Sequence, residues 1–235
     1  MQTITTDTTV GEIVRAAPAR SRIFEKLGID YCCGGKKPLS EVCAAKGLDP
    51  ITIVAMLSAL DDVADTRQTD ADLMSLSELC DHISSTHHNH LREELPRLDF
   101  MTRKVAAVHG DHEPRLAEIR REFQGFLALV APHIEQEDNE IFPEIKRLDA
   151  AVNAESGASF DGLLEKLEHE HESTGKALAR FKDLTDDYTP PEWACNTFRA
   201  LYDALSELEK ETHQHIHKEN NILFPKAKAR IKKAA

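Results

Sequence analysis

Two segments of the chain repeat one pattern of metal-binding side chains. One reads HIEQEDNEIFP from His133, and the other reads HIHKENNILFP from His215. In each, a glutamate follows the histidine by four residues, at Glu137 and Glu219. On a helix such a pair lies on one face, so an imidazole and a carboxylate can approach the same point. Two such pairs on facing helices supply ligands for a carboxylate-bridged pair of iron or manganese ions in a four-helix bundle.

Helical register adds one histidine from each of the two other long helical segments. His171 shares an apolar stripe with Leu164 and Leu178, whereas His169 falls outside it. His88 shares a stripe with the leucines three, seven and ten residues later. We therefore select His171 and His88 as candidate ligands.

The separations along the chain support one shared site. His88 and His171 are 83 residues apart, and His133 and His215 are 82 apart, as expected for two helical hairpins related by a pseudo-two-fold axis. In an antiparallel bundle these positions would converge toward one end. The predicted metal ligands are His88, His133, Glu137, His171, His215 and Glu219.

This ligand set favours a two-metal centre. Imidazole and carboxylate suit iron, manganese or zinc, and the paired carboxylates favour two metals over mononuclear zinc. Glu137 and Glu219 would bridge the metals, which leaves each metal an open position for O2, NO or peroxide. The alternative is that the repeat serves only packing, in a structural bundle that folds without metal.

The remaining histidines are interpreted as surface or core residues without a metal, and we expect His213 and His217 to be solvated. His109 lies on the stripe of His88, but 21 residues of helix span roughly 31 Å. It could join the site only if the helix broke, for example at Pro96, so its role stays open. The histidines interpreted in this way are His82, His87, His90, His112, His169, His213 and His217.

Helical spacing dominates the whole chain, and alternation of period two is scarce, so the fold class should be all-α. Short connections between the long segments favour an antiparallel up-down-up-down four-helix bundle. The apolar residues Leu79 and Ile83 fit more than one register in the first segment. The long segments are expected at 75–108, 113–148, 160–184 and 192–228. The expected domains are a small helical domain at 1–60, a linker at 61–74 and the bundle at 75–235.

Residues 30–35 read DYCCGG and place two thiols beside two glycines. Adjacent cysteines are poorly placed for an ordinary disulfide, so Cys32 and Cys33 are expected to be free thiols. In a flexible, open loop these thiolates could bind metal or exchange disulfides. The alternative is a tight buried turn of small residues. The other three cysteines, Cys43, Cys80 and Cys195, are interpreted as small core residues.

The bulk properties limit the partners. A formal charge of -12 argues against nucleic acid or an anionic membrane. No apolar run is long enough to cross a bilayer, and the first residues do not form a signal peptide. We therefore expect a soluble, cytoplasmic protein.

The DYCCGG segment, followed by a bundle that carries His-x-x-x-Glu and Phe-Pro twice, resembles the Repair of Iron Centres family. The resemblance spans nearly the whole chain. It implies a hemerythrin-like bundle with two non-haem iron ions, oxo- or hydroxo-bridged, on the six ligands above. It also implies a response to oxidative and nitrosative stress, in which damaged iron-sulfur proteins are repaired by donation of iron or by handling of NO. The family's cysteine pair corresponds to Cys32 and Cys33, which we hypothesise take part in thiol and iron transfer.

Other functions use the same bundle. A hemerythrin-type carrier or sensor of O2 or NO normally has an asymmetric centre with an extra histidine, which the symmetric repeat does not supply. A di-iron oxidase or NO-reducing enzyme would turn over small molecules at the open positions, so whether the protein is an enzyme stays open. A homodimer is compatible with the sequence.

Overall fold

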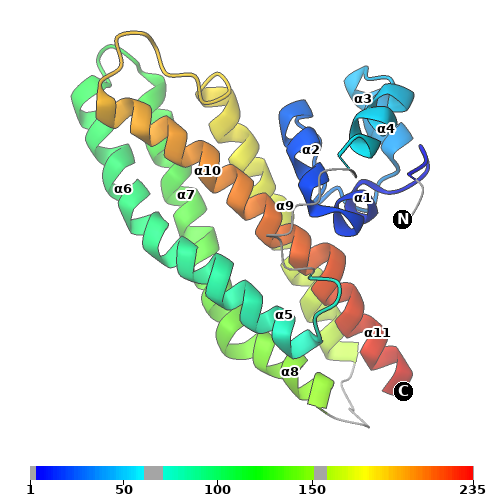
Figure 1. Ribbon diagram of the computed structural model, residues 1–235. Helices are drawn as coiled ribbons and strands as arrows, with labels where there is room; N and C mark the ends of the chain where they lie inside the picture. Colours follow the sequence, from blue (N-terminus) through cyan, green and yellow to red (C-terminus); the bar gives the residue numbers. More distant parts are fainter. Residues whose placement is uncertain (1–3, 61–70, 151–157, 235) are drawn as a thin grey trace.

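The computed structural model describes residues 4–60, 71–150 and 158–234 (Figure 1). Within these ranges the chain forms helices and turns, with one isolated antiparallel bridge between Thr9 and Pro38 and no β-strand. This confirms the all-α fold class. The predicted linker at 61–74 lies mostly outside the described residues, and residues 71–74 form a turn.

The N-terminal part is a small helical unit with its own core. Thr9 begins the first helix with a capping box to Glu12, and Asp49 caps the last helix through the N–H groups of Ile51 and Thr52. Phe24 and Leu39 are completely buried in its apolar cluster. Its helices are α1 Val10–Ala16, the short 3-10 helix Pro18–Arg20, α2 Ser21–Leu27, α3 Leu39–Lys46 and α4 Pro50–Ser58.

The described residues from 76 onward form four long antiparallel helical rods (Figure 1). Their apolar stripes face one another, and α6 packs against α7 and α10, while α7 also packs against α9. The rods comprise α5 Leu76–Ile83 with α6 Asn89–His109, α7 Arg115–Gln136 with α8 Phe142–Ala150, α9 Ala158–Leu184, and α10 Asn196–Lys218 with α11 Phe224–Ala234. The predicted up-down-up-down bundle is confirmed.

Three of the described rods contain a π-helical turn, which the sequence patterns did not reveal. The turns are Ser84–His88, Glu137–Ile141 and Glu219–Leu223. Each inserts an extra residue per turn and so changes the face that the next residues present. In the first rod this explains the uncertain register, because Ile83 and His88 are both fully buried although they are five residues apart.

The predicted ligands lie between two apolar clusters, so the expectation that they converge at one end of the bundle is wrong. One cluster contains Phe123 and Phe181, and the other contains Ile145 and Leu164. The physical reason is that α8 and α11 continue the rods past the Phe-Pro pairs, with each phenylalanine as the first helical residue. A proline in the first turn of a helix needs no hydrogen-bond donor, so the rods do not end there.

Candidate metal centre

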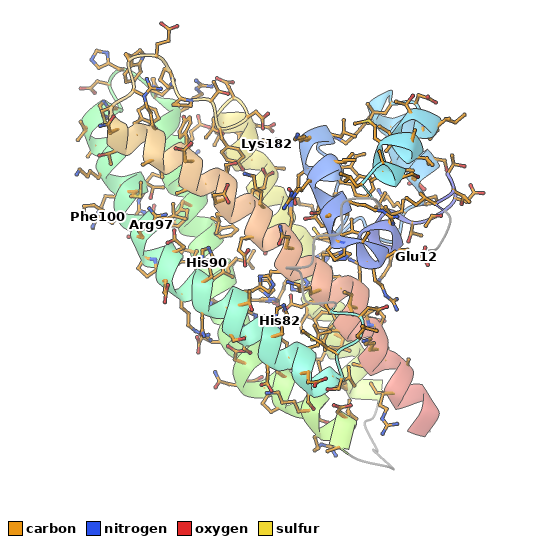
Figure 2. The ribbon with its side chains drawn as sticks, in the orientation of Figure 1. Glu12, His82, His90, Arg97, Phe100 and Lys182 are labelled. Atoms are coloured by element: carbon orange, nitrogen blue, oxygen red, sulfur yellow. The ribbon has the colours of Figure 1, made fainter. Side chains whose placement is uncertain are left out.

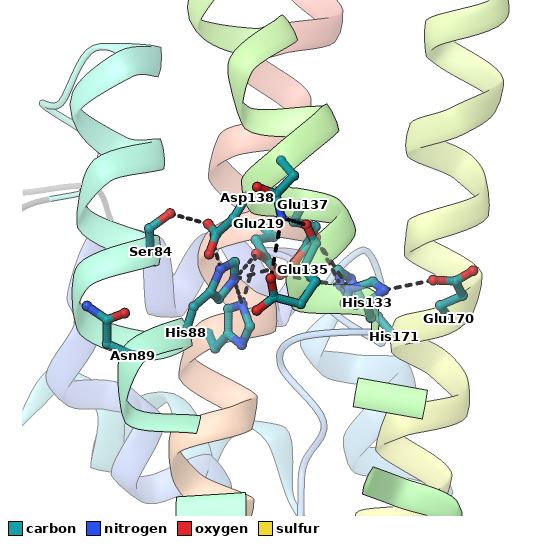
Figure 3. A network of polar contacts seen from close by, with 12 residues as sticks. Ser84, His88, Asn89, His133, Glu135, Glu137, Asp138, Glu170, His171 and Glu219 are labelled. Atoms are coloured by element: carbon teal, nitrogen blue, oxygen red, sulfur yellow. Dashed lines mark hydrogen bonds and ion pairs between the residues drawn. The ribbon is translucent and has the colours of Figure 1, made fainter. Parts of the chain in front are cut away.

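The structure brings the six predicted ligands together at the level of the π-helical turns (Figure 3). Glu137 and Glu219 have no exposed surface, and each of the four histidines is less than a tenth exposed. Two groups of ligand atoms form, each with its atoms within 4.8 Å of one another. One group is His88, Glu137, His215 and Glu219, and the other is His133, Glu137 and His171.

The histidines face each other in two pairs. The Nε2 atoms of His88 and His215 lie 3.0 Å apart, and those of His133 and His171 lie 2.9 Å apart. In each pair one ring comes from the first half of the bundle and one from the second. Each pair therefore presents two ring nitrogens to one point.

Each glutamate spans both histidine pairs. The Oε2 atom of Glu137 lies 3.4 Å from His88 Nε2, and its Oε1 atom lies 3.3 Å from His133 Nε2. Glu219 does the same with the other two rings, with Oε1 2.9 Å from His215 Nε2 and Oε2 3.3 Å from His171 Nε2. This is the arrangement expected of two carboxylates that bridge two metal ions.

Outer acceptors orient three of the four rings. The Nδ1 atom of His88 lies 2.9 Å from Asp138 and that of His133 lies 2.7 Å from Glu170 (Figure 3). The Nδ1 atom of His171 lies 2.8 Å from the Asn220 side-chain oxygen. An acceptor at Nδ1 favours the tautomer whose Nε2 lone pair is free for a metal.

Asp138 is fixed as an anion by several donors. Partial burial raises its pKa, but hydrogen bonds from His88, Ser84 and Arg92 outweigh this and hold the pKa well below its usual range. The Arg92 guanidinium donates to Asp138 over 2.6 Å. Asp138 is therefore a charged acceptor for His88 across the physiological pH range.

The two central carboxylates fit a bound metal. Both oxygens of Glu137 and the Oε2 atom of Glu219 are buried and accept no hydrogen bond from the part of the chain that the structure describes. A buried carboxylate without such partners costs several kcal/mol, roughly, unless a cation neutralises it. Nitrogen lone pairs and carboxylate oxygens at one buried point suit iron, manganese or zinc.

Aromatic rings cover the centre. Phe142 stacks on His88 with ring centroids 5.4 Å apart, and Phe224 stacks on His171 at 6.0 Å. Both phenylalanines follow directly after a π-helical turn. Each Phe-Pro pair thus packs over one histidine, His88 in one histidine pair and His171 in the other.

The cysteine loop lies against the centre. The Cys33 thiol is 3.3 Å from the backbone oxygen of His171, and it is half-buried. Cys32 is only 2 % exposed, so the expectation of an open loop is wrong for this residue. A hydrogen bond with Cys33 and burial raise the pKa of the Cys32 thiol well above its usual value. Asp30 lies beside both, and its carboxylate and the two sulfurs lie within 4.8 Å of one another.

A cleft of about 1360 Å³ opens between the N-terminal helices and the bundle. Cys33 lines it, together with Lys37 of the small domain and Lys176 and His213 of the bundle. Lys182 lies on this side of α9 (Figure 2). The cleft gives the Cys33 thiol access to solvent, whereas none of the six candidate metal ligands lines it.

The structure corrects the interpretation of two histidines. His217 is 5 % exposed rather than solvated, and its Nδ1 atom lies 3.3 Å from the backbone oxygen of Tyr31. Burial lowers its pKa to about 4, so the ring is neutral at physiological pH. His213 is half-buried, with its ring 6.1 Å from that of Tyr31. The register of one helix could not reveal that the N-terminal domain covers this face.

The other histidines remain outside the centre. His87 is a buried core residue between Glu211 and Lys218, and its ring stacks on that of His215. His90 is exposed on α6 (Figure 2).

The far end of α6 holds His109, because Pro96 does not break this helix. His109 Nε2 lies 3.2 Å from the thiol of Cys195. Cys195 is exposed, so its interpretation as a core residue is wrong, whereas Cys43 and Cys80 are buried as expected. The sequence around Cys195 lacks the long helical register that would have placed it, since α10 begins only at Asn196.

Two family models match the chain. Residues 6–61 match ScdA_N, a domain of unknown function (DUF542), and residues 81–227 match the hemerythrin HHE cation binding domain. Within the described residues, no helix combines the length and apolar character that crossing a bilayer requires.

Similar proteins cover almost the whole chain. The "Iron-sulfur cluster repair protein ScdA" of Staphylococcus haemolyticus is 33% identical over 223 residues, 95% of this chain and 99% of that protein. The "Iron-sulfur cluster repair protein YtfE" of Yersinia pseudotuberculosis is 35% identical over 218 residues, 93% of this chain and 95% of the relative. The YtfE of Edwardsiella ictaluri is 34% identical over 221 residues, 94% and 96% of the two chains.

Proposed function

Because the chain belongs to the iron-sulfur cluster repair proteins that join an ScdA_N domain to a hemerythrin domain, we propose that it repairs iron-sulfur clusters damaged by oxidative or nitrosative stress. The observation that carries this proposal is that a candidate metal centre and a pair of cysteines lie next to each other. A buried centre of four histidines and two glutamates lies directly beneath a thiol loop, with Cys33 3.3 Å from the backbone of His171.

The centre is proposed to hold two non-haem iron ions. His88 and His215 would hold one and His133 and His171 the other, while Glu137 and Glu219 bridge them. An oxo or hydroxo bridge would complete the site. When bound, the irons would supply a ligand site for NO or O2 and a store of transferable iron. The chain's own part is to orient three of the four rings through Nδ1 and to exclude water with Phe142 and Phe224.

The cysteine loop is proposed to receive iron and hand it on. Cys32 and Cys33, with the Asp30 carboxylate beside them, offer two sulfurs and an oxygen within 4.8 Å of one another. Soft thiolates and a carboxylate together suit ferrous iron as a transient cargo. The cleft in front of Cys33 would admit an exposed segment of the damaged client protein.

A carrier function is less well supported. A hemerythrin-type centre would need a further histidine ligand, and the nearest buried candidates bond elsewhere. His87 contacts Glu211 and Lys218, and His217 contacts the Tyr31 backbone. A second alternative, an NO-reducing enzyme, would use the same six ligands. Multiple turnover of NO with an electron donor would distinguish such an enzyme from a stoichiometric iron donor.

The test begins with metal content and Mössbauer spectra of protein purified without oxygen. We expect two antiferromagnetically coupled irons per chain, with the signal lost or weakened in Glu137→Ala and in Glu219→Ala. Glu135→Ala is the matched control, because this exposed glutamate belongs to the same helix and pairs with Arg92 rather than with a histidine. Zinc, or no metal, in the native protein would refute the di-iron proposal.

Function is tested by adding the iron-loaded protein to an extract in which NO has damaged iron-sulfur enzymes. We expect recovery of their activity with wild type and with Glu135→Ala, and little recovery with the two bridging variants. Equal recovery with metal-free protein would show that the centre has no part in repair.

A further inference from the structure

The two halves of the repeat differ in the contacts made by the residues two before and two after the glutamate. In the first half these are Glu135 and Asn139, which are both exposed. Glu135 pairs with Arg92, and Asn139 donates to the Glu135 backbone oxygen over 2.8 Å. Among the described residues, these two side chains contact each other's segment and Arg92 of the neighbouring rod.

In the second half the same two positions are His217 and Asn221, and both face the N-terminal domain. The Asn221 side-chain amide donates to the backbone oxygen of Cys32 over 3.0 Å and lies 3.5 Å from that of Tyr31. His217 Nδ1 lies 3.3 Å from the same Tyr31 oxygen. The two side chains thus bind consecutive carbonyl groups of the cysteine loop.

The small domain is shaped to receive Asn221. A Cβ atom at Gly35 would lie 2.3 Å from the Asn221 side-chain oxygen, and one at Gly11 would lie 2.5 Å from it. Real Cβ atoms do not approach so closely, so a side chain at either position would displace the asparagine. The Gly11 N–H donates to the Gly35 backbone oxygen over 2.9 Å, so the two glycines lie side by side and together form the seat of Asn221.

One π-helical turn connects the seat to the metal centre. Glu219 faces the centre, Asn220 accepts from His171, and Asn221 holds the cysteine loop. Adjacent side chains on a helical turn point in different directions, so these three consecutive residues contact three different partners. The loop in turn places the Cys33 thiol against the backbone of His171. The ring of this same histidine is oriented by Asn220.

We propose that Asn221 is a positioning residue that docks the thiol loop onto the bundle and holds Cys33 at the edge of the centre. Its use in moving iron rests on the proposed function, whereas the docking itself does not. The pseudo-symmetric Asn139 has no such role. The cysteine loop therefore serves only one side of a centre whose ligands are otherwise symmetric.

The test compares Asn221→Asp with the matched control Asn139→Asp. Each change preserves the side-chain shape and adds one charge two residues after a bridging glutamate, but only Asn221→Asp would turn an acceptor toward the Cys32 and Tyr31 carbonyl oxygens. The readout is the alkylation rate of Cys32 in the full-length, iron-loaded protein without oxygen, followed by peptide mass spectrometry. We expect roughly tenfold faster alkylation in Asn221→Asp, the scale of one lost hydrogen bond, and no change in Asn139→Asp.

Iron content and repair are measured on the same samples. We expect both variants to keep wild-type iron, and Asn221→Asp alone to lose repair activity. Unchanged alkylation of Cys32 in Asn221→Asp, or equal acceleration in both variants, would overturn the docking role. Faster alkylation with full repair would overturn its use in iron transfer.

If the wild-type protein did not repair iron-sulfur clusters, the proposed function would be refuted. The alkylation rate of Cys32 would still show whether Asn221 docks the cysteine loop. Should Asn221→Asp fold poorly, Asn221→Ser removes the amide without adding charge, with Asn139→Ser as its control.

Discussion

At the scale of single residues, the four ligand rings are all imidazoles, but the groups that accept hydrogen bonds from the Nδ1 atoms of three of them differ in type and charge. His88 bonds to an aspartate, His133 to a glutamate and His171 to an asparagine. A charged acceptor makes an imidazole a stronger donor to metal than a neutral amide does. The ring nitrogens of this symmetric ligand set are therefore unequal in basicity.

Replacement of Asp138 by alanine should weaken iron binding at His88. The expected loss of affinity is about 10- to 100-fold, the usual effect of removing a partner that orients a ligand. Competition with a chelator, monitored by the iron absorption band, measures it. Glu135→Ala should leave the affinity unchanged, and an equal loss there would point to surface charge as the cause.

Gly35→Ala should destabilise the protein by about 1 to 3 kcal/mol, because the new methyl group overlaps Asn221 and the Tyr31 carbonyl oxygen. Gly125→Ala is the control, since a Cβ atom there meets nothing within 4 Å and alanine favours the helix by about 0.5 to 1 kcal/mol. Urea denaturation of both variants compares them. A stable Gly35→Ala protein would show that the seat of Asn221 is loose.

At the scale of elements, the π-helical turns set the direction of each rod beyond the centre. Insertion of an alanine after Asn139 should rotate α8 by about 100°, because each further residue advances a helix by that angle and the turn Glu137–Ile141 already holds one extra residue. Phe142 would then leave His88, and we expect loss of bound iron and a lower melting temperature. Asn139→Ala keeps the chain length and should retain both. Full iron content in the insertion variant would contradict this role of the turn.

Periodicity was sufficient to predict the four rods and all six residues at the centre. Apolar residues every three or four positions identify a helix face even when a later turn contains an extra residue. The face that carries His133 and Glu137 was therefore predicted correctly. The π turns themselves went unseen, because a single extra residue looks like a change of register, as at Ile83. The place of the centre along the bundle was also wrong, because the ligands were assigned to one end of each helix, whereas apolar clusters pack on both sides of them.

At the scale of the whole molecule, ion pairs join the small domain to two rods. Glu168 of α9 accepts from Lys36 over 2.9 Å and from Lys228 of α11 over 2.8 Å. Partial burial raises the pKa of Glu168, but these two lysines outweigh it and hold the pKa below its usual value. No pattern within a single helix could predict this contact or the burial of His217, since both depend on a domain far away in the sequence.

This lowered pKa predicts a pH dependence. The contribution of Glu168 to stability is fully present above the pKa of an unfolded glutamate, about 4.3, and is lost as the pH falls through the lower folded value. Glu168→Gln should lack this part of the acid destabilisation. Melting temperatures between neutral pH and about pH 3 measure the difference, and parallel curves for the two proteins would show that the ion pairs add nothing.

Removal of both thiols should abolish the proposed delivery of iron without affecting its storage at the centre. In Cys32→Ala/Cys33→Ala we expect wild-type iron content and loss of repair, because the six ligands stay while the proposed receiver is gone. Cys195→Ala, which removes an exposed thiol far from the centre, should behave as wild type. Undiminished repair by the double variant would exclude the thiol route.

The Cys33 thiol lies against the backbone of His171, so it is next to one of the two histidine pairs of the centre. If the proposed pair of irons emptied through this thiol, the iron held by His133 and His171 would leave first, and the iron held by His88 and His215 would remain. The protein would then pass through one defined half-empty form. A preparation drained to a single iron per chain would be uniform, with one sharp spectral signature instead of a mixture.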